Sequence, residues 1–450
     1  AFCITPDQVG EVFGSGAVYI FQKDFRTIYG DYISGNYSIE NLKSDQLTKG
    51  WKYDISNKEI TFIPPSAKSV DTDRETLYPE NDFWLTGSNS ISNQLASGVQ
   101  SFLSEFNSSS VLVISNPGYS NSLVTLTDYL DANSYIYSVL LLGESLLNDP
   151  SMVEMMNNAT CAIIAGDSLE VLSLLNQSGT LLSGAFYNKI INDNFPLYLV
   201  GDAGKISGSY YIDNLEEDVY AAYRGKMTNN SGLNLFGDLI FQPRLFEDSD
   251  YHENRMCAVL WGLMRNRNRF GIYLDGNALA QVNANEKSVS LSGLIPALIV
   301  DATEASFVDS STYNATSSMG HRQVVAMNNL RYSLTTYDNA SYSFTDRKFN
   351  FTTGFNRDDI IQPKNTFLFQ NYPNPFNPKT NISFQVPATS HVQINIYDVL
   401  GRKIYTLINE IITTGRHNLS FNASTLPSGI YFYRLLTNNR SLIKKMILLK

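Results

Sequence analysis

The stretch Phe195–Gly208, FPLYLVGDAGKISG, decides the fold that this sequence predicts. Its apolar first half predicts a buried strand, and the strand runs into a turn with Asp202 at its apex. Gly201, Ala203 and Gly204 surround this residue. Small neighbours on both sides of one polar residue are typical of a nucleophile elbow, where the chain bends sharply and pushes one side chain outward. The sequence therefore predicts an elbow with a carboxylate where a Ser or Cys normally lies.

Strands alternate with helices on both sides of this elbow. Before it, the expected elements are, in chain order, strand 84–87, helix 92–106, strand 110–116, helix 121–131, strand 136–142, helix 150–157, strand 161–167 and helix 169–175. After it, strands are expected over 235–246, 270–282 and 288–302, and one helix face carries Met256, Val259, Leu260, Leu263 and Met264. This alternation is typical of stacked βαβ units and predicts an α/β domain over residues 83–336, with a parallel sheet flanked by helices.

The two ends of the chain have a different character. Residues 1–82 contain short alternating runs and predict a β-rich N-terminal extension. This extension either covers the next domain or pairs through its strand edges with a neighbouring subunit. Residues 337–365 are expected to be a joining segment that adds a strand or two. Residues 366–450 carry short runs separated by turns at roughly ten-residue spacing, which predicts a β-sandwich.

Composition and charge narrow the range of functions. With 450 residues and 43% apolar content the chain can bury a large core, and its net charge of −10 argues against nucleic acid as a partner. No apolar run reaches the roughly 20 residues needed to span a bilayer. The first residues, AFCITPDQ, lack an initiator Met and fit a mature chain whose signal peptide has been removed. Export is therefore expected.

The cysteines predict neither a metal site nor a cofactor. Cys3, Cys161 and Cys257 have no metal-ligand spacing and no haem-attachment pair. Cys161 lies in an apolar strand and Cys257 on an apolar helix face, so both are expected to be buried and inert. Cys3 is the candidate for pairing between subunits. Asn-x-Ser/Thr sequons, which are candidate glycan sites, include Asn107, Asn158, Asn314 and Asn350.

The C-terminal region carries an ordered series of motifs. These are NYPNPFNPKTNISF (371–384), IYDVLGRKI (396–404) and LPSGIYFYRL (426–435). Together they resemble the C-terminal sorting domain of type IX secretion substrates. The resemblance implies an immunoglobulin-like sandwich, export by the type IX machinery and a final location outside the cell or on its outer surface. The Pro-rich lead-in is not expected to form regular sheet.

The middle of the chain resembles another family through the order of its landmarks. AIIAGDSLEVLSLL (162–175) is similar to a strand that ends in Gly-Gly-Asp-Gln before a leucine-rich helix, and LVGDAGK (199–205) is similar to an elbow of the type Gly-Thr-Ser-Ala-Gly-Ala. FQPRLF (241–246) and GIYLDGNALAQV (271–282) follow in the expected order. This region therefore resembles the cyanophycinase-like serine peptidases, which have a class I glutamine amidotransferase-like fold.

Carried over residue by residue, the resemblance implies a degenerate site. Asp202 stands at the position of the nucleophilic Ser, Arg244 at that of the His base, and Gln242 replaces a nearby Asp. A serine hydrolase needs a hydroxyl nucleophile and a base within hydrogen-bond reach. Gly166 and Asp167 keep part of the substrate-side loop. The resemblance thus implies a site that lacks the groups of a serine hydrolase, and Asp202 and Arg244 are candidates for an ion pair across it.

Three functions remain open at the level of sequence. The first is a non-catalytic, self-assembling extracellular component, such as a surface layer, filament or tube, built from a homo-oligomer. The second is an active secreted hydrolase that uses Asp202, with His252 as the candidate base. The third is a binding module in which Arg244 holds an anionic ligand. The backbone candidates for ligand binding are Gly166, Asp167, Gly201, Ala203 and Gly204.

Overall fold

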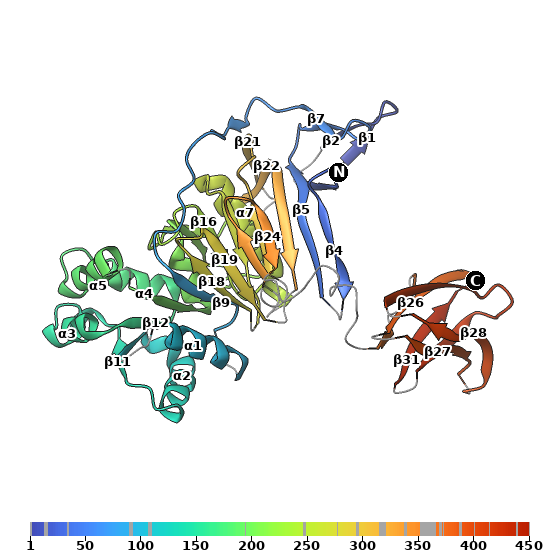
Figure 1. Ribbon diagram of the computed structural model, residues 1–450. Coiled ribbons are helices and arrows are strands. Elements are labelled where there is room, and N and C mark those ends of the chain that lie inside the picture. Colours follow the sequence, from blue (N-terminus) through green and yellow to red (C-terminus); the bar gives the residue numbers. More distant parts are fainter. Residues whose placement is uncertain are drawn as a thin grey trace. The chain divides into compact units, whose positions relative to one another are not determined.

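The computed structural model divides the chain into two compact units (Figure 1). The first comprises Ala1–Tyr29 and Ser38–Phe351, and the second comprises Gly30–Tyr37 and Thr352–Lys450. The structure describes residues 2–12, 17–33, 36–89, 93–106, 110–193, 195–245, 249–276, 278–293, 297–314, 321–336, 340–351, 366–368, 371, 373–386, 389–399, 401–413, 415–437 and 440–449. Within these ranges, no helix has the length and apolar character that a membrane span requires.

A mixed sheet forms one side of the first unit. Its nine strands, counted over the described residues, lie in the order β11-β10-β12-β13-β9-β18-β19-β23-β24. Their bounds are β9 (Phe83–Thr86), β10 (Val111–Ser115), β11 (Tyr137–Leu141), β12 (Cys161–Ala165), β13 (Leu197–Val200), β18 (Leu279–Asn283), β19 (Ser288–Ser292), β23 (Ala340–Ser343) and β24 (Lys348–Phe351). The strands from β11 to β9 pair in parallel, and those from β18 to β24 pair antiparallel. The predicted parallel sheet is therefore confirmed for one half of this sheet and wrong for the other half.

Helices cover both faces of the parallel half, as the βαβ rhythm predicts (Figure 1). They are α1 (Asn93–Glu105) and α2 (Ser120–Ala132) on one face, and α3 (Pro150–Asn158), α4 (Ser168–Leu175) and α5 (Leu181–Asp193) on the other. Successive side chains of β9 point to opposite faces of the sheet. Trp84 packs on Phe102 of α1 with ring centroids 5.0 Å apart, whereas Phe83 and Leu85 belong to the core below α4 and α5. Helix α5 is additional to the elements that the sequence predicts.

A second mixed sheet packs against the first. In the described part of the chain it also has nine strands, namely β16 (Leu239–Gln242), β17 (Phe270–Tyr273), β20 (Ala297–Asp301), β22 (His321–Thr335), β21 (Phe307–Asn314) and β8 (Lys68–Ser69), with β5 (Asn36–Leu47), β3 (Val18–Gln22) and β4 (Ile28–Ile33) joined through β22. Phe241 and Phe270 of this sheet share one apolar core with Leu85 and Val282 of the first. Helix α7 (His252–Asn266) covers the opposite face, where Val259 lies among the buried residues.

Two stretches that predict single strands instead cross from one sheet to the other. The stretch 270–282 contains β17 in the second sheet and β18 in the first. The stretch 288–302 contains β19 in the first sheet and β20 in the second. The first crossing occurs at a turn in which Gly276 has φ +50°. There the backbone of Asp275 approaches Gly87 so closely that a Cβ on Gly87 would lie 2.5 Å from it. Alternation of apolar residues predicts each strand but not the sheet that it joins.

Apart from Gly30–Tyr37, the N-terminal residues belong to the first unit. Strand β5 pairs along β22, so residues 1–82 supply strands to the second sheet rather than standing apart from it. A small sheet made of β1 (Phe2–Ile4), β2 (Val9–Val12), β6 (Lys52–Asp54) and β7 (Glu59–Phe62) accompanies it. Of the two roles expected for this extension, the structure shows the first, which is packing against the rest of its own chain. Pairing with a neighbouring subunit stays a prediction.

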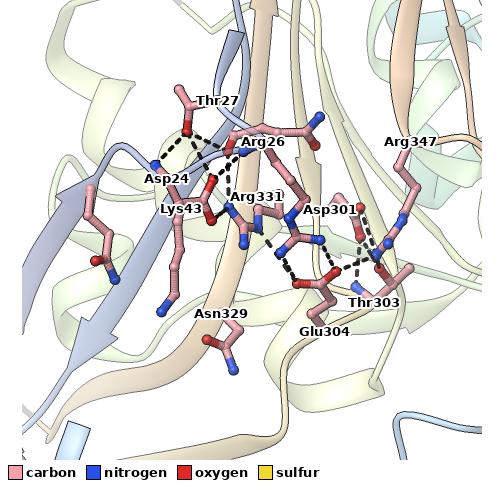
Figure 2. A network of polar contacts seen from close by, with 12 residues as sticks. Asp24, Arg26, Thr27, Lys43, Asp301, Thr303, Glu304, Asn329, Arg331 and Arg347 are labelled. Carbon is pink, nitrogen blue, oxygen red and sulfur yellow. Dashed lines mark hydrogen bonds and ion pairs between the residues drawn. The ribbon is translucent and has the colours of Figure 1, made fainter. Parts of the chain in front are cut away.

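A cluster of charged side chains fastens this N-terminal segment (Figure 2). Arg26 forms a two-pronged pair with Glu304, with its Nη2 2.6 Å from Oε2. Arg331 on β22 lies 2.6 Å from Asp24, and Arg347, from the β23–β24 hairpin of the first sheet, lies 2.9 Å from Glu304. We call these five residues the Glu304 cluster. It links the N-terminal segment with both large sheets.

The second unit consists of two antiparallel sheets. In its described residues these are β25 (Phe367–Leu368), β26 (Lys379–Val386) and β29 (Gly415–Asn422), and, separately, β28 (Lys403–Ile412), β27 (Ser390–Tyr397), β30 (Gly429–Leu436) and β31 (Ser441–Leu448). Phe384 and Phe421 of the first sheet share a core with Ile394 and Tyr433 of the second. The β-rich C-terminal unit is confirmed, and its immunoglobulin-like topology stays a prediction.

The Pro-rich lead-in to this unit is held by single hydrogen bonds rather than by a strand ladder. The backbone N–H of Asn371 donates to the Tyr433 hydroxyl at 2.8 Å, and the N–H of Ile447 donates to Asn374 Oδ1 at 2.8 Å. An irregular segment is what a Pro-rich sequence predicts, because Pro cannot donate to a ladder.

Several sequence predictions receive a partial answer. Cys161 is buried as expected, but Cys257 is only half-buried. Cys3 is exposed. Of the sequons, Asn158 and Asn350 are exposed. Ser92, Asn107, residues 352–365 and the side chain of Asn314 lie outside what the structure describes, and glycosylation stays a prediction.

Candidate functional site

The predicted site residues meet at one edge of the first sheet. Strands β9, β10, β12 and β13 are parallel and in register, so their carboxyl ends lie together. In parallel sheets, loops that follow these ends form the usual binding and catalytic edge. The residues that follow these strands here are Asn89, Asn116, Asp167 and Asp202. Arg244 arrives from the second sheet, just after β16.

The Asp202 carboxylate lies at the centre of this edge, and its side chain is 13% exposed. Its Oδ2 accepts hydrogen bonds from Asn89 Nδ2 at 2.6 Å, from Arg244 Nη1 at 3.0 Å and from the Tyr119 hydroxyl at 3.2 Å. Lys205 Nζ lies 3.7 Å from Oδ1. The ion pair expected between Asp202 and Arg244 is therefore present, and three further side chains take part.

These partners set the charge of Asp202. Burial alone would raise the pKa of its carboxyl, but the Lys205 and Arg244 cations and the hydrogen bonds from Asn89 and Arg244 outweigh burial and lower this pKa to about 2. Burial and the neighbouring Asp202 and Asp167 carboxylates raise the pKa of Tyr119. At neutral pH the aspartate is ionised and the tyrosine is a protonated donor.

The charges continue beyond Asp202 in both directions. On one side, the buried Lys205 Nζ lies 2.8 Å from Asp213 Oδ1, and Ser168 donates to the other oxygen of that carboxylate at 3.3 Å. Burial tends to lower the pKa of Lys205, but the Asp202 and Asp213 carboxylates raise it. Lys205 is therefore a buried cation held between two anions.

On the other side, Arg244 reaches a second carboxylate. Its Nη1 lies 3.1 Å from Glu216 Oε1, and Arg255 Nη2 lies 2.6 Å from the same oxygen. Arg255 is 1% exposed. Positive and negative groups thus alternate along one row of side chains, which we call the Asp202 chain: Asp213, Lys205, Asp202, Arg244, Glu216 and Arg255. Its formal charges sum to zero.

The backbone of the predicted elbow is tightly enclosed. Residues Gly201–Ser207 form a buried 3-10 segment, η3. The left-handed conformation is found at Gly201, with φ +52°, and not at Asp202. A Cβ on Gly201 would lie 2.0 Å from Asn89 Oδ1, and one on Gly204 would lie 2.5 Å from the Phe241 ring. Only glycine fits these two positions, because protein atoms occupy the space that a side chain needs.

The loop after β12 has a structural partner in Asn116. Asp167 caps α4 by accepting from the Glu170 N–H at 2.9 Å. Glu170 does not reach back to the cap, as it would in a capping box, because its carboxylate accepts from Asn116 Nδ2 at 2.6 Å. Asn116 Oδ1 in turn accepts from the Asp167 N–H at 2.9 Å. A Cβ on Gly166 would lie 2.5 Å from that oxygen.

The comparison with known families concerns the C-terminal unit. Residues 370–449 match the family model of the secretion system C-terminal sorting domain. The chain carries a type IX sorting domain. It is therefore exported to the cell surface or the extracellular space, as the sequence predicts.

Comparisons of the whole chain are less informative. No curated protein matches it. Among solved structures, it is similar to a candidate peptidase E from Listeria monocytogenes EGD-e, with 14% identity and a TM-score of 0.36 over 48% of this chain and 99% of the other. It is also similar to PorZ, described as an essential bacterial surface component of the type-IX secretion system of Porphyromonas gingivalis, with 14% identity and a TM-score of 0.15 over 38% and 30% of the two chains. At these TM-scores neither likeness carries an argument, and the cyanophycinase-like assignment stays a prediction.

Two predicted site residues, Gln242 and His252, have no described contact with the Asp202 carboxylate. The Gln242 amide is 2% exposed and donates to the Pro243 carbonyl at 2.9 Å. His252 begins α7, and it is not among the described residues that contact the Asp202 carboxylate. Among the described residues, the contacts of the Asp202 carboxylate thus include Arg244 and no histidine.

The members of this site that the sequence does not reveal come from four separate segments. Asn89 follows β9, Tyr119 follows β10, Lys205 lies three residues after Asp202, and Glu216 follows the strand β14 (Tyr210–Asp213). A usable signal exists for Asn89 and Tyr119, because each comes shortly after the carboxyl end of a predicted parallel strand. Within the described residues, no three His, Cys, Asp or Glu side chains gather in a way that could hold a metal ion.

Proposed function

We propose that this exported protein is a non-catalytic structural component of the extracellular space or outer cell surface. In this proposal the elbow of a peptidase-like unit stabilises the fold through ion pairs instead of carrying out a reaction. The observation that carries it is the state of Asp202, whose buried carboxylate is held by Asn89, Tyr119, Arg244 and Lys205.

The contacts of Asp202 argue against covalent catalysis. A carboxylate nucleophile must present a lone pair to substrate, and the hydrolysis of its ester needs a base that activates water. Oδ2 of Asp202 accepts three hydrogen bonds, and Oδ1 faces Lys205. The cation in the position implied for the base is Arg244, and a guanidinium stays protonated at physiological pH.

The contacts of Arg244 argue against an anion clamp. Its guanidinium lies against both Asp202 and Glu216, and the charges of the Asp202 chain are already balanced. An incoming anion would therefore compete with two carboxylates that belong to the protein. The buried glycines of η3 likewise present their backbone to protein atoms.

Self-assembly is the second part of the proposal. The N-terminal strands and turns expose several large apolar side chains, which a partner could cover. Phe25 is 95% exposed. Its exposed apolar companions are Ile4, Tyr19, Phe21, Ile28 and Phe62. A second copy of the chain would cover them and produce a surface layer, filament or tube.

The catalytic question is decided by an assay of the full chain on casein, short peptides and polyaspartate-type isopeptides. We expect no turnover above buffer for the wild type. The matched variant is Asp202→Asn, checked for folding by circular dichroism at the assay temperature, with Glu216→Gln as a second variant in the same row. Wild-type turnover that is lost in Asp202→Asn but kept in Glu216→Gln would refute the proposal.

The assembly question is decided by light scattering and electron microscopy of the full chain over a range of concentrations. We expect ordered oligomers that Phe25→Ser weakens, with Val399→Ser as a control at another exposed apolar residue, in the C-terminal unit. A monodisperse monomer at every concentration would remove this part of the proposal and leave the non-catalytic part intact.

A further inference from the structure

Strand β11 is an unprotected edge of the first sheet. In the described part of the chain β10 is its strand neighbour, and the sheet order ends at β11. Natural proteins protect such edges with Lys, Pro or bulges, because the N–H and C=O groups along an edge are a template for another strand. The sequence of β11, YSVLL, has no charge and no Pro, and its pairing with β10 has no bulge. The exposed apolar side chains along it are Ile136, Val139 and Leu141.

The strand at the opposite end of the same sheet shows the contrast. Strand β24 carries Lys348, a residue type that discourages strand addition. The backbone N–H of its Phe349 donates to the buried Glu40 carboxylate at 2.9 Å, so another part of the chain covers this edge. The two edges of one sheet are thus treated differently, and β11 is the edge that can accept a strand.

The charges around β11 are negative. Residues 75–188, which include the helices and strands from β9 to α4, contain no Lys, Arg or His. The Tyr137 hydroxyl donates to Asp131 Oδ1 at 3.0 Å, which places that carboxylate at the start of β11. Glu144 follows the end of the strand and is exposed. Further exposed carboxylates on α2 and α3 are Asp128 and Glu154.

These charges argue against pairing of β11 with the β11 of a second copy. A two-fold contact brings the same surface of each copy together, so the carboxylates around one β11 would face those around the other. Like charges that face each other across an interface cost several kcal/mol. The occupant that fits this edge is therefore a strand in basic surroundings.

The chain itself contains such a strand in its C-terminal unit. Strand β31 is the last strand of its sheet and reads SLIKKMIL. Residues 411–450 contain no Asp or Glu. Ile443 is an exposed apolar residue of β31. The basic residues of this region are Arg416, Arg434, Arg440, Lys444, Lys445 and Lys450.

The Pro-rich lead-in contacts one end of β31. The Phe376 N–H donates to the Ile447 carbonyl at 2.9 Å, and the Leu449 N–H donates to the Phe376 carbonyl at 3.0 Å. Residues 441–446 precede these contacts. Strand β28, at the opposite end of this sheet, is less suitable, because it carries Glu410 and its pairing with β27 has two register shifts.

We propose that the edge of β11 in one copy pairs with the edge of β31 in a second copy. The added strand would supply main-chain hydrogen bonds, and the basic residues beside it would face the carboxylates around β11. Such a contact joins two different surfaces, so it repeats from copy to copy and builds a filament instead of a closed dimer. The inference deepens the self-assembly part of the proposed function and rests on it.

The test uses the full chain with Phe25→Ser as the parent protein, because this substitution weakens the contact already proposed for the N-terminal strands. Sedimentation velocity over a range of concentrations measures the association of the parent. We expect association at about 50 mM NaCl that is at least about tenfold weaker at about 500 mM NaCl, since salt screens the attraction between the two edges.

Two charge reversals of the parent identify the two surfaces. The acidic-side variant combines Asp128→Lys with Glu144→Lys, and the basic-side variant combines Arg440→Glu with Lys444→Glu. Each alone should associate at least about tenfold more weakly than the parent. An equimolar mixture of the two should form a dimer that does not grow, because each variant keeps one intact edge.

The matched control combines Glu217→Lys with Asp346→Lys. Both residues are exposed and lie outside residues 75–188, and the net charge changes as much as in the acidic-side variant. Association should be unchanged. Circular dichroism checks the folding of every variant. If Lys444→Glu prevents folding, Arg440→Glu alone, at an exposed residue just before β31, should still weaken association severalfold.

Four results would overturn the inference: a parent that stays monomeric at low salt, a control that associates as weakly as the acidic-side variant, a mixture without dimers, or a basic-side variant that associates like the parent. Wild-type oligomers together with a monomeric parent would overturn this contact and leave self-assembly intact. A wild type that is monomeric at every concentration would remove both.

Discussion

The Asp202 chain and the Glu304 cluster both keep a carboxylate ionised within the folded protein, but they do so in different surroundings. The pKa values of Asp202 and Glu304 are both lowered to about 2. Burial is the largest influence on Asp202 and opposes the shift, whereas the hydrogen bond from Arg26 is the largest influence on Glu304 and favours it. The side chains are 13% and 29% exposed respectively.

Similar pKa values at the two carboxylates therefore do not imply similar losses of stability when each carboxylate is removed. Water can replace a lost partner at Glu304, because that side chain is partly exposed. At Asp202 the cations Arg244 and Lys205 are themselves buried and keep only Glu216 and Asp213 as partners, so losing the carboxylate leaves one uncompensated positive charge in the Asp202 chain. An unpaired buried charge is destabilising by several kcal/mol.

The largest expected effect is therefore that of Asp202→Ala. We expect the free energy of unfolding to fall by about 3–5 kcal/mol, because two buried cations lose their shared anion. Guanidinium denaturation followed by circular dichroism measures it. Asp128→Ala, at an exposed position of α2, is the control and should stay within about 0.5 kcal/mol of the wild type.

Glu304→Gln should lower the free energy of unfolding by less, about 2 kcal/mol. The substitution removes charge-assisted hydrogen bonds, but water can solvate Arg26 and Arg347. The same denaturation experiment applies. If Glu304→Gln were more destabilising than Asp202→Ala, burial would not be what separates the two regions.

Double-mutant cycles would sharpen the comparison further. For Asp202→Asn with Arg244→Met we expect a coupling energy of about 2 kcal/mol. For Asp24→Asn with Arg331→Met, where the Asp24 side chain is 24% exposed, we expect less than about 1 kcal/mol. Equal coupling in the two cycles would contradict the role given to burial.

The smallest expected effect is on the pH dependence of stability. The pKa of Asp202 is lowered from 3.8 to about 2 and that of Glu304 from 4.5 to about 2, so both contribute stability that is present above pH 4.5 and lost as the pH falls toward 2. Burial raises the pKa of Asp301, so this group acts in the opposite direction and gains stability on protonation.

Denaturation curves between pH 2 and 7 measure this dependence. Asp202→Asn should flatten the loss of stability below about pH 4 relative to the wild type, since one of the groups that titrate there is gone. A variant curve parallel to that of the wild type over this range would show that Asp202 is not held ionised by its neighbours.

The sequence by itself determined the local features of this protein. Apolar alternation and turn residues predicted the strands of the parallel half and most of its helices, and the C-terminal motifs predicted export. The stretch 195–208 also identified Asp202, and its comparison with Arg244 anticipated their ion pair. These signals are local, because strand periodicity and turn chemistry act over a few residues.

Only the tertiary structure decided which strands share a sheet and which charged side chains contact one another. The turn at Gly276 sends β17 and β18 to different sheets, and no periodicity records that choice. Asn89, Tyr119 and Glu216 join the Asp202 carboxylate or its guanidinium partner from segments far apart in sequence. Parallel pairing brings strand ends together whatever their separation along the chain, so the composition of that edge is a property of the fold.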